Sequence, residues 1–316
     1  MCFIVWPSFV LYIFLFLQSL HPSHAVLLRQ EYLALKMLYE KFNGLNWTYG
    51  DASMRGSSYS NTLPGSISNV MNQLVNKWDF TTVNFTNPCT RHDGKEDPCK
   101  CLWKGLYCSR TENVTHISIL WLRSWNLDGE FFDDLFSNFT VLRVVQLSSN
   151  RIRNTIPSSL LMKNTLKVIA IDNNTLSGKL HSFLNLHELE LLSLLGNNLS
   201  GTLPAFPPSI KTLLLGDNSF SGNISQICSA PNLRAVDLSL CKFSGQLPSC
   251  VGSLTNLFSL SAFRNKLTGT LNPNLANLEQ LEILHLGENS FEGPIPADFQ
   301  SLTSLGRCFR FCFSNI

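Results

Sequence analysis

The chain has 316 residues, of which 15% are charged and 44% hydrophobic, and its formal net charge is +2. This near-neutral balance argues against a nucleic-acid-binding protein, because phosphate binding needs a concentrated basic face. The low charge and high apolar content exclude a disordered chain, and a prior of about 150 residues per domain suggests two domains.

Residues 1–25 are predicted to be a secretory signal peptide. The apolar run over residues 2–20 is followed by Ser23 and Ala25 at the −3 and −1 positions of a signal-peptidase site. A run of about 18 apolar residues can also span a bilayer, so an uncleaved anchor is the alternative. Cleavage is favoured because Pro7 and polar residues shorten the run. We therefore expect a secreted protein, or a cell-surface one if the chain is part of a longer receptor.

Residues 26–113 are predicted to form an N-terminal cap that contains a helix and a cysteine cluster. Apolar side chains recur at helical spacing within residues 26–43, at Leu28, Tyr32, Leu35, Tyr39 and Phe42. The cysteines of the cluster are Cys89, Cys99, Cys101 and Cys108.

These four cysteines are predicted to form disulfides, because an oxidising secretory compartment favours them. A zinc site that includes His92 is the alternative, but the spacing of its ligands matches no common zinc template. Four cysteines allow three connectivities. We favour Cys101–Cys108 with Cys89–Cys99 but cannot deduce it.

A repeated sequence frame occupies residues 114–304. Its clearest copy, residues 281–296, reads Leu-x-x-Leu-x-Leu-x-x-Asn-x-Phe-x-Gly-x-Ile-Pro. Eight copies occur, and their asparagine position recurs at intervals of 21 to 25 residues. The residues at this position are Trp125, Asn150, Asn174, Asn197, Asn218, Cys241, Asn265 and Asn289. Such a period predicts one stacked solenoid with a continuous core rather than two globular domains.

This frame resembles the leucine-rich repeat of plant-type extracellular proteins, and residues 101–108 (CLWKGLYC) are similar to the N-cap motif of that family. The resemblance implies an α/β repeat solenoid, a right-handed coil with a parallel β-sheet on its concave face and a disulfide-bearing helical N-cap. The L-x-L alternation predicts one short strand per unit, and the L-x-G-x-[IL]-P half predicts a second strand on the flank. The asparagines are expected to form a hydrogen-bonded ladder between coils.

Ligand recognition is expected on the concave face, whose outward residues are free of the repeat constraint. The predicted ligand-binding residues are Trp121, Arg123, Gln146, Asp172, Leu195, Leu214, Asp237, Phe263, Arg264 and His285. The apolar residues expected to be exposed anchors are Trp121, Leu195, Leu214, Leu240 and Phe263. The alternative is that small residues on this face only permit curvature and that the apolar ones are incidental.

Seven glycosylation sequons occur, at Asn46, Asn84, Asn113, Asn138, Asn173, Asn198 and Asn223. A glycan on Asn173 would block the middle of the concave face. It would direct ligands to one end of the face or to the flank.

Four later cysteines and the C-terminal tail are ambiguous. Cys228 and Cys250 occupy similar positions in neighbouring units, and buried thiols are favoured over a bridge between coils. In residues 305–316 the repeat frame breaks down, and Cys308 cannot bridge Cys312 within a strand. A truncated product with a non-native tail and a terminal bulged strand are the two hypotheses.

No catalytic motif is present, so we expect no enzyme activity, no cofactor and no metal. The resemblance implies a receptor-like ectodomain, complete or truncated, in signalling or defence. The alternatives are a secreted inhibitor of cell-wall polygalacturonase-type enzymes and a structural or adhesive matrix glycoprotein. The expected partner is an extracellular protein or peptide, including a co-receptor or a cell-wall enzyme. A membrane partner requires that the N-terminal run stays uncleaved or that the full-length chain continues.

Overall fold

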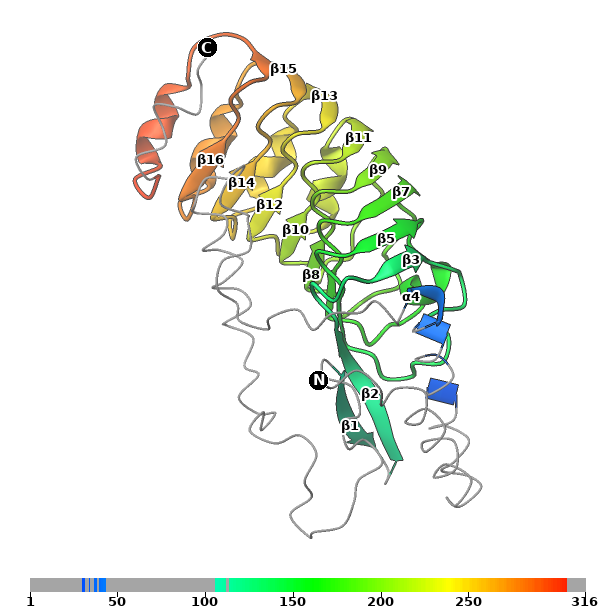
Figure 1. Ribbon diagram of the computed structural model, residues 1–316. Coiled ribbons are helices and arrows are strands. Elements are labelled where there is room, and N and C mark those ends of the chain that lie inside the picture. The colour runs from blue at the N-terminus through cyan, green and yellow to red at the C-terminus, as the bar shows by residue number, and fades with distance from the viewer. Residues whose placement is uncertain are drawn as a thin grey trace, which may run out of the picture.

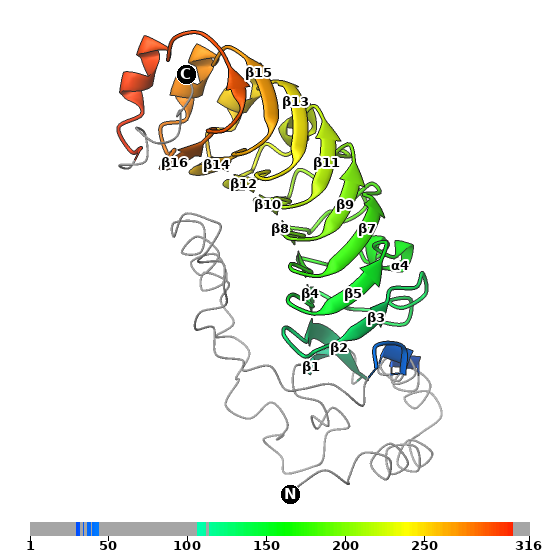
Figure 2. The ribbon, with the colours of Figure 1, turned by 45° about the horizontal axis from the view of Figure 1, so that its top comes forward.

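The computed structural model describes residues 30, 31, 34, 37, 38, 40–43, 106–111 and 114–305. Over the repeats, the chain winds into a stack of coils that curves into an arc (Figures 1 and 2). Several sequence-based predictions lie outside the described residues: the signal peptide, the sequons at Asn46, Asn84 and Asn113, and Cys89, Cys99, Cys101, Cys308 and Cys312.

A nine-stranded sheet follows the concave side of the arc (Figure 2). The L-x-L segments form its strands, because strand alternation sends the leucines into the core and the residue between them outward. From one end to the other, the strands are β1 (Leu106–Thr111), β2 (Val114–Trp121), β4 (Val144–Gln146), β6 (Val168–Ala170), β8 (Leu191–Ser193), β10 (Thr212–Leu214), β12 (Ala235–Asp237), β14 (Ser259–Ser261) and β16 (Ile283–His285).

An eight-stranded sheet on the flank confirms the second predicted strand of each unit. The flank strands contain a position with a left-handed backbone, which glycine adopts without strain. At Gly201, φ is +86°, and a Cβ would lie only 2.9 Å from Lys179 Cγ. Its strands in chain order are β3 (Asp128–Glu130), β5 (Arg151–Asn154), β7 (Thr175–Lys179), β9 (Asn198–Gly201), β11 (Ser219–Gly222), β13 (Lys242–Gln246), β15 (Lys266–Gly269) and β17 (Ser290–Phe291).

The first strand of the concave sheet, β1, runs antiparallel to β2, whereas the later neighbours in the sheet are parallel. This hairpin pairs the edge that the first coil would otherwise expose. The sequence predicts a cap for this reason, but it does not predict the hairpin. Cys108 lies on β1.

The convex side of the arc consists of short helical turns that return the chain to the next concave strand (Figure 1). The turns are α4 (Ser158–Leu161), η4 (Ser225–Ser229), η5 (Ser249–Ser253), η6 (Pro273–Asn277) and η7 (Ala297–Ser301).

One continuous hydrophobic core runs through the stack. The inward leucines of every coil are buried, as for Leu192, Leu213 and Leu260, each with no exposed surface. Phenylalanines of neighbouring coils stack on one another, and the ring centroids of Phe220 and Phe243 lie 6.2 Å apart. Because each coil covers the apolar face of the next, no coil is expected to be stable alone.

The predicted asparagine ladder is confirmed. Asn197 Nδ2 donates to the carbonyl oxygens of Ile171 and Leu194, both at 3.0 Å, and of Leu195 at 3.2 Å. Its Oδ1 accepts from the Leu176 N–H at 3.0 Å. The same kind of bonding recurs at the equivalent asparagines: Asn150, Asn174, Asn218, Asn265 and Asn289. One amide therefore satisfies backbone groups of two adjacent coils that the turn would otherwise bury without partners.

Two ladder positions carry other residues. Cys241 supplies only a weak donor, its Sγ lying 3.7 Å from the Leu215 carbonyl oxygen, and burial raises the pKa of its thiol to about 12. Trp125 is buried at the start of the ladder, and its backbone N–H donates to Asn150 Oδ1 at 3.0 Å. The asparagine of the neighbouring coil thus bonds to the first coil at this position.

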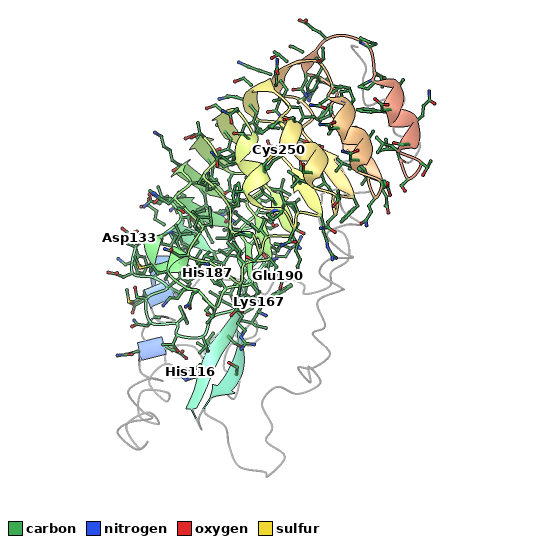
Figure 3. The ribbon with its side chains drawn as sticks, turned by 180° about the vertical axis from the view of Figure 1, so that it is seen from behind. His116, Asp133, Lys167, His187, Glu190 and Cys250 are labelled. Atoms are coloured by element: carbon green, nitrogen blue, oxygen red, sulfur yellow. A yellow bond between two sulfur atoms is a disulfide. The ribbon has the colours of Figure 1, made fainter. Side chains whose placement is uncertain are left out.

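The predicted cap helix is helical at residues 30, 31, 34, 37, 38, 40 and 41, and Phe42 is buried as expected. Glu31 shares its buried face, where its carboxylate accepts from the Ile117 N–H at 3.1 Å and lies 3.3 Å from His116 Nδ1. Burial raises the pKa of Glu31, although the Ile117 N–H and His116 oppose this shift. This contact joins the helix to β2 near the end of the arc where Figure 3 labels His116.

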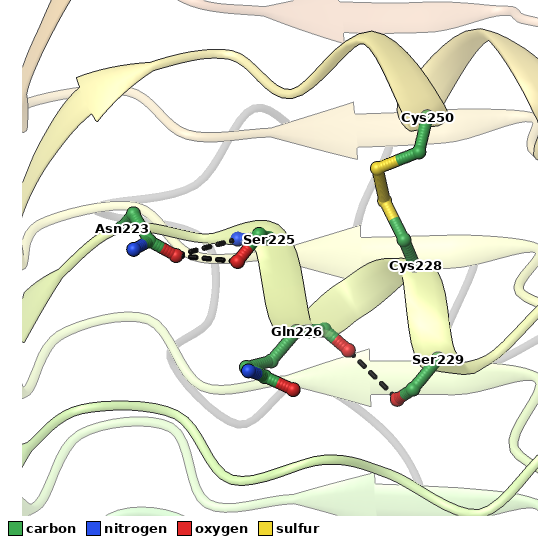
Figure 4. Close-up of a disulfide and its surroundings, with 6 residues drawn as sticks. All are labelled: Asn223, Ser225, Gln226, Cys228, Ser229 and Cys250. Atoms are coloured by element: carbon green, nitrogen blue, oxygen red, sulfur yellow. Dashed lines mark hydrogen bonds between the residues drawn. A yellow bond between two sulfur atoms is a disulfide. The ribbon is translucent and has the colours of Figure 1, made fainter.

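Cys228 and Cys250 form a disulfide between η4 and η5 (Figure 4), so the expectation of two buried thiols is wrong. The two convex turns pack against each other and bring the Cα atoms to 6.0 Å, a normal disulfide spacing. The sequence left this open because the two cysteines are not in identical register.

Candidate ligand-binding face

The concave sheet presents a row of side chains formed by the central residue of each L-x-L segment. Parallel pairing places Leu214 opposite Asp237, Asp237 opposite Ser261, and Ser261 opposite His285. A second row is formed by the residues two positions after these in the sequence, such as Ser239 after Asp237 and Phe263 after Ser261. Adjacent strands are about 4.8 Å apart, so each side chain lies between same-row neighbours of two other coils.

This close spacing corrects part of the predicted exposed surface. Leu195 is 4% exposed and Leu214 is 1% exposed, so the prediction that they are exposed anchors is wrong. Gln146, Asp172 and Asp237 are buried as well. Side chains of adjacent coils are this close in every row, a crowding that the pattern of a single unit does not reveal.

The remaining predicted residues are accessible and fall at the two ends of the arc. Trp121 and Arg123 are half-buried near the cap. Phe263 and His285 are half-buried near the other end, and Arg264 is exposed beside them. Leu240 is also half-buried. The structure therefore separates the predicted site into two clusters on different coils.

The cluster at the C-terminal end is held by ring stacking and one ion pair. The rings of Phe263 and His285 are nearly parallel, with centroids 4.4 Å apart, and the Arg264 guanidinium carbon lies 5.5 Å from the Phe263 centroid. Arg264 Nε donates to Glu288 at 2.5 Å. Burial lowers the pKa of His285, and the Glu288 carboxylate partly opposes that shift. The shift favours the neutral form of the His285 ring.

Arg264 and Glu288 come from equivalent corners of neighbouring coils. Both follow a concave strand and precede a ladder asparagine, and both have a left-handed backbone, with φ of 55° and 51°. Leu240 occupies the same corner with φ of 55°. Because this conformation disfavours side chains with a Cβ, the repeat geometry imposes it. The sequence does not reveal these conformations, since glycine occurs at this corner only at Gly196.

Asp172 is at the centre of a buried polar network across three coils. Its carboxylate accepts from Ser148 Oγ at 2.8 Å, from Ser193 Oγ, and from the Leu195 N–H at 3.2 Å. Its own N–H donates to Ser148 Oγ at 3.1 Å. This side chain was predicted to contact ligand, but these hydrogen bonds are with the protein itself.

Asp237 is equally buried but poorly satisfied. Its Oδ1 accepts from the Ser239 N–H at 2.9 Å, whereas its Oδ2 has no hydrogen-bond partner in the described structure. Burial raises the pKa of Asp237, the Ser239 hydrogen bonds lower it, and the nearby Asp217 carboxylate raises it further.

The sequons of the repeats differ in exposure. Asn173, Asn198 and Asn223 are exposed, and Asn138 is half-buried. In Figure 4, Asn223 Oδ1 accepts from both the N–H and the hydroxyl of Ser225, at 3.1 and 2.5 Å. No sequon follows Asn223 in the sequence, so the C-terminal part of the concave face carries none.

The repeated carboxylates are surface groups of the coils. Glu190 Oε2 lies 2.6 Å from Lys211 Nζ, and Glu188 lies 3.6 Å from Lys167 Nζ. Figure 3 labels Lys167 and Glu190, which lie on neighbouring coils. Within the described part of the chain, no group of three or more His, Cys, Asp or Glu side chains could hold a metal ion. No helix of that part is long and apolar enough to cross a membrane.

A groove that the sequence did not predict lies between the cap helix and the flank sheet. Its volume is about 840 Å³, and its lining includes Lys41, Asp128, Glu130 and Arg153. Arg153 of β5 pairs with Asp128 of β3 at 2.5 Å. The positive and the negative charge of this pair therefore compensate each other in the lining of the groove.

These repeats are similar to those of known proteins. A family model described as Leucine Rich Repeat matches residues 232–254 and 280–302. The chain is 33% identical over 188 residues to Receptor-like protein EIX2 of Solanum lycopersicum, which covers 51% of this chain and 18% of that protein. It is 31% identical over 233 residues to Receptor-like protein 41 of Arabidopsis thaliana, covering 71% of this chain and 24% of the relative. The chain thus spans less than a quarter of the length of these relatives.

Among solved structures, the ectodomain of the Arabidopsis receptor kinase HAESA is similar to this arc. The TM-score is 0.58 at 30% sequence identity, over 65% of this chain and 39% of that chain. That ectodomain was solved in complex with an N-terminally extended IDA peptide hormone ligand.

Proposed function

Because the chain is a leucine-rich repeat protein of the plant extracellular type, we propose that it recognises an extracellular peptide or protein through its concave face, as the ligand-binding part of a receptor-like protein. The proposed location is the cell exterior, either secreted or at the cell surface. The proposed action is binding, without a chemical step.

The observation that carries the proposal is the similarity of the arc to an ectodomain solved with a bound peptide hormone. The relatives in sequence are likewise named receptor-like proteins. The structure adds a physical basis, since the ladder and the continuous core hold the concave strands in fixed positions. A rigid face loses little conformational freedom on binding, which favours affinity.

The C-terminal cluster is the proposed contact region. Phe263, Arg264 and His285 combine aromatic surface with charge, a composition typical of residues that dominate binding energy. A glycan on Asn173 would not reach coils this far along the arc as readily as the middle coils. The buried residues Gln146, Leu195 and Leu214 are proposed to support this face by packing.

Capture from plant extracellular fluid tests the proposal. The purified full chain is immobilised, and bound peptides and proteins are identified by mass spectrometry for wild type and Phe263→Ala. The matched control is Met162→Ala, which removes a side chain that is 73% exposed at the end of α4, away from the concave face. We expect the same ligand with wild type and Met162→Ala, and a loss of about tenfold or more with Phe263→Ala.

Equal capture by all three proteins would remove the concave face as the binding surface. Inhibition of a fungal polygalacturonase by the purified chain would instead support the secreted-inhibitor alternative.

A further inference from the structure

Asp237 faces the concave side of the sheet, not the core. It is the last residue of β12, and its neighbours Val236 and Leu238 both belong to the hydrophobic core. Strand alternation therefore directs the Asp237 carboxylate to the ligand side. A charged group placed there at 1% exposure costs free energy unless it finds partners.

The protein supplies only part of those partners. The Ser239 N–H satisfies Oδ1, but the hydroxyls of Ser239 and Ser261 bond to each other at 2.6 Å. Oδ2 is left without a partner in the described structure. The equally buried Asp172 shows that the same fold can saturate a concave carboxylate, with two serine hydroxyls and a backbone N–H.

Two cations of the neighbouring coils are engaged elsewhere. Arg264 pairs with Glu288, and Lys211 pairs with Glu190. Asp217 adds a second negative charge near Asp237 and disfavours its ionised form. A positive group from outside would relieve both the missing hydrogen bond and the repulsion between these carboxylates.

An aromatic side chain of the next coil follows the buried carboxylate on the concave face. Phe263 is diagonal to Asp237 across β12 and β14, in the same relation that lets Phe263 stack on His285 across β14 and β16. Diagonal neighbours of this kind lie about 7–8 Å apart. Phe263 thus lies between the carboxylate and the second ring.

We infer that Asp237 and the Phe263–His285 stack form a subsite for an arginine side chain of the bound peptide segment, an inference that rests on the proposed function. Once the side chains that cover Asp237 move aside, its Oδ2 accepts from the guanidinium, whose planar and aliphatic parts pack against Phe263. Arginine suits this position better than lysine, because a guanidinium is more weakly hydrated than an ammonium and enters a dry site at lower cost. The Glu288 partner neutralises Arg264, so this residue does not repel the incoming cation.

The test uses a phage-displayed library of random peptides, selected on the purified full chain. Peptides that bind wild type are synthesised with arginine and with citrulline, which keeps the shape but removes the charge. We expect arginine enrichment among the selected peptides, and a drop in affinity of about tenfold or more on the change to citrulline. With Asp237→Asn, the citrulline effect is expected to vanish. With the control Asp172→Asn, whose carboxylate is already satisfied, it is expected to persist.

The outcomes separate the subsite from the proposed function. Peptides that bind wild type and are lost with Phe263→Ala, but show no arginine preference, overturn the subsite and leave the proposed function in place. A citrulline effect that survives in Asp237→Asn also overturns the subsite. If no peptide is enriched, both fail. Circular dichroism and thermal unfolding establish that each variant is folded.

Discussion

Asp172 and Asp237 are two carboxylates on the same concave sheet, each 1% exposed, and their surroundings differ in kind. Asp172 is saturated by hydrogen bonds from the coils on either side, whereas one oxygen of Asp237 lacks a partner in the described structure. Equal burial therefore does not mean equal hydrogen bonding. The difference lies in whether the protein itself completes the hydrogen bonds.

The same contrast distinguishes the ladder from the binding face. Every ladder asparagine that is present bonds to backbone groups of neighbouring coils, so removing one leaves buried groups unpaired. Removing the Asp237 carboxylate affects the hydrogen bonds of one residue, Ser239. The variants below sharpen this contrast, from the largest expected effect to the smallest.

Asn197→Ala is expected to have the largest effect on stability, with a loss of about 3–4 kcal/mol in the free energy of unfolding. The change removes the acceptor of the Leu176 N–H and the donor to three carbonyl groups. Urea denaturation followed by circular dichroism measures the loss. Asn197→Asp keeps the acceptor but places a buried carboxylate oxygen against three carbonyl oxygens, so it should lose at least as much at neutral pH; a much smaller loss would show that the donated bonds contribute little.

Asp172→Ala is expected to lower the free energy of unfolding by about 2 kcal/mol. Two buried serine hydroxyls and the Leu195 N–H lose their shared acceptor. The same denaturation experiment applies, with Asp237→Ala as the matched control at equal burial. A control as damaging as Asp172→Ala would contradict the distinction between the two carboxylates.

Cys241→Asn is expected to stabilise the protein by about 1 kcal/mol, because it restores an amide to the ladder. Cys241→Ala, which removes the weak thiol donor without replacing it, is the control and should not stabilise. Since burial raises the pKa of Cys241 to about 12, the thiol stays protonated at neutral pH. The gain should therefore be the same at pH 6 and at pH 8 in thermal unfolding, and a loss of stability would mean that the site is too small for asparagine.

Asp237→Asn is expected to have the smallest effect, and one that depends on pH. Burial raises the pKa of Asp237 above its usual 3.8, so its contribution to stability is fully present below that pH and is lost as pH rises through the folded-state pKa. The Tm of the variant should therefore equal that of wild type in acid and exceed it at neutral pH. A Tm difference that does not change with pH would contradict a raised pKa.

The architecture was accessible from the sequence because it depends on a period. Repetition fixes the inward leucines, the ladder asparagines and the flank glycines, since each has the same neighbours in every coil. Where a feature depends on a particular pair of coils, the pattern fails. Asp172 and Asp237 occupy positions two residues apart in the repeat frame, and the serines around them also differ in whether they bond to the carboxylate.

The candidate site was predicted in part for the same reason. Phe263, Arg264 and His285 are on the accessible concave face as expected, but Leu195 and Leu214 are buried. The Glu31–His116 contact joins residues 85 positions apart, and no period relates them. The disulfide likewise depends on how two convex turns pack, which the near-match in register could not decide.

The Cys228–Cys250 disulfide has a consequence for how the stack opens. A solenoid whose coils contact only their neighbours unfolds as a linear array, and it divides most readily where the coupling between coils is weakest. The ladder loses its amide at Cys241, and the disulfide joins the turns on either side of that coil's strands, η4 and η5. A covalent link on the convex side thus lies at a coil whose ladder position has a thiol instead of an amide. In hydrogen exchange, the oxidised arc should open as one cooperative unit across this coil, and a reduced arc should separate there into two.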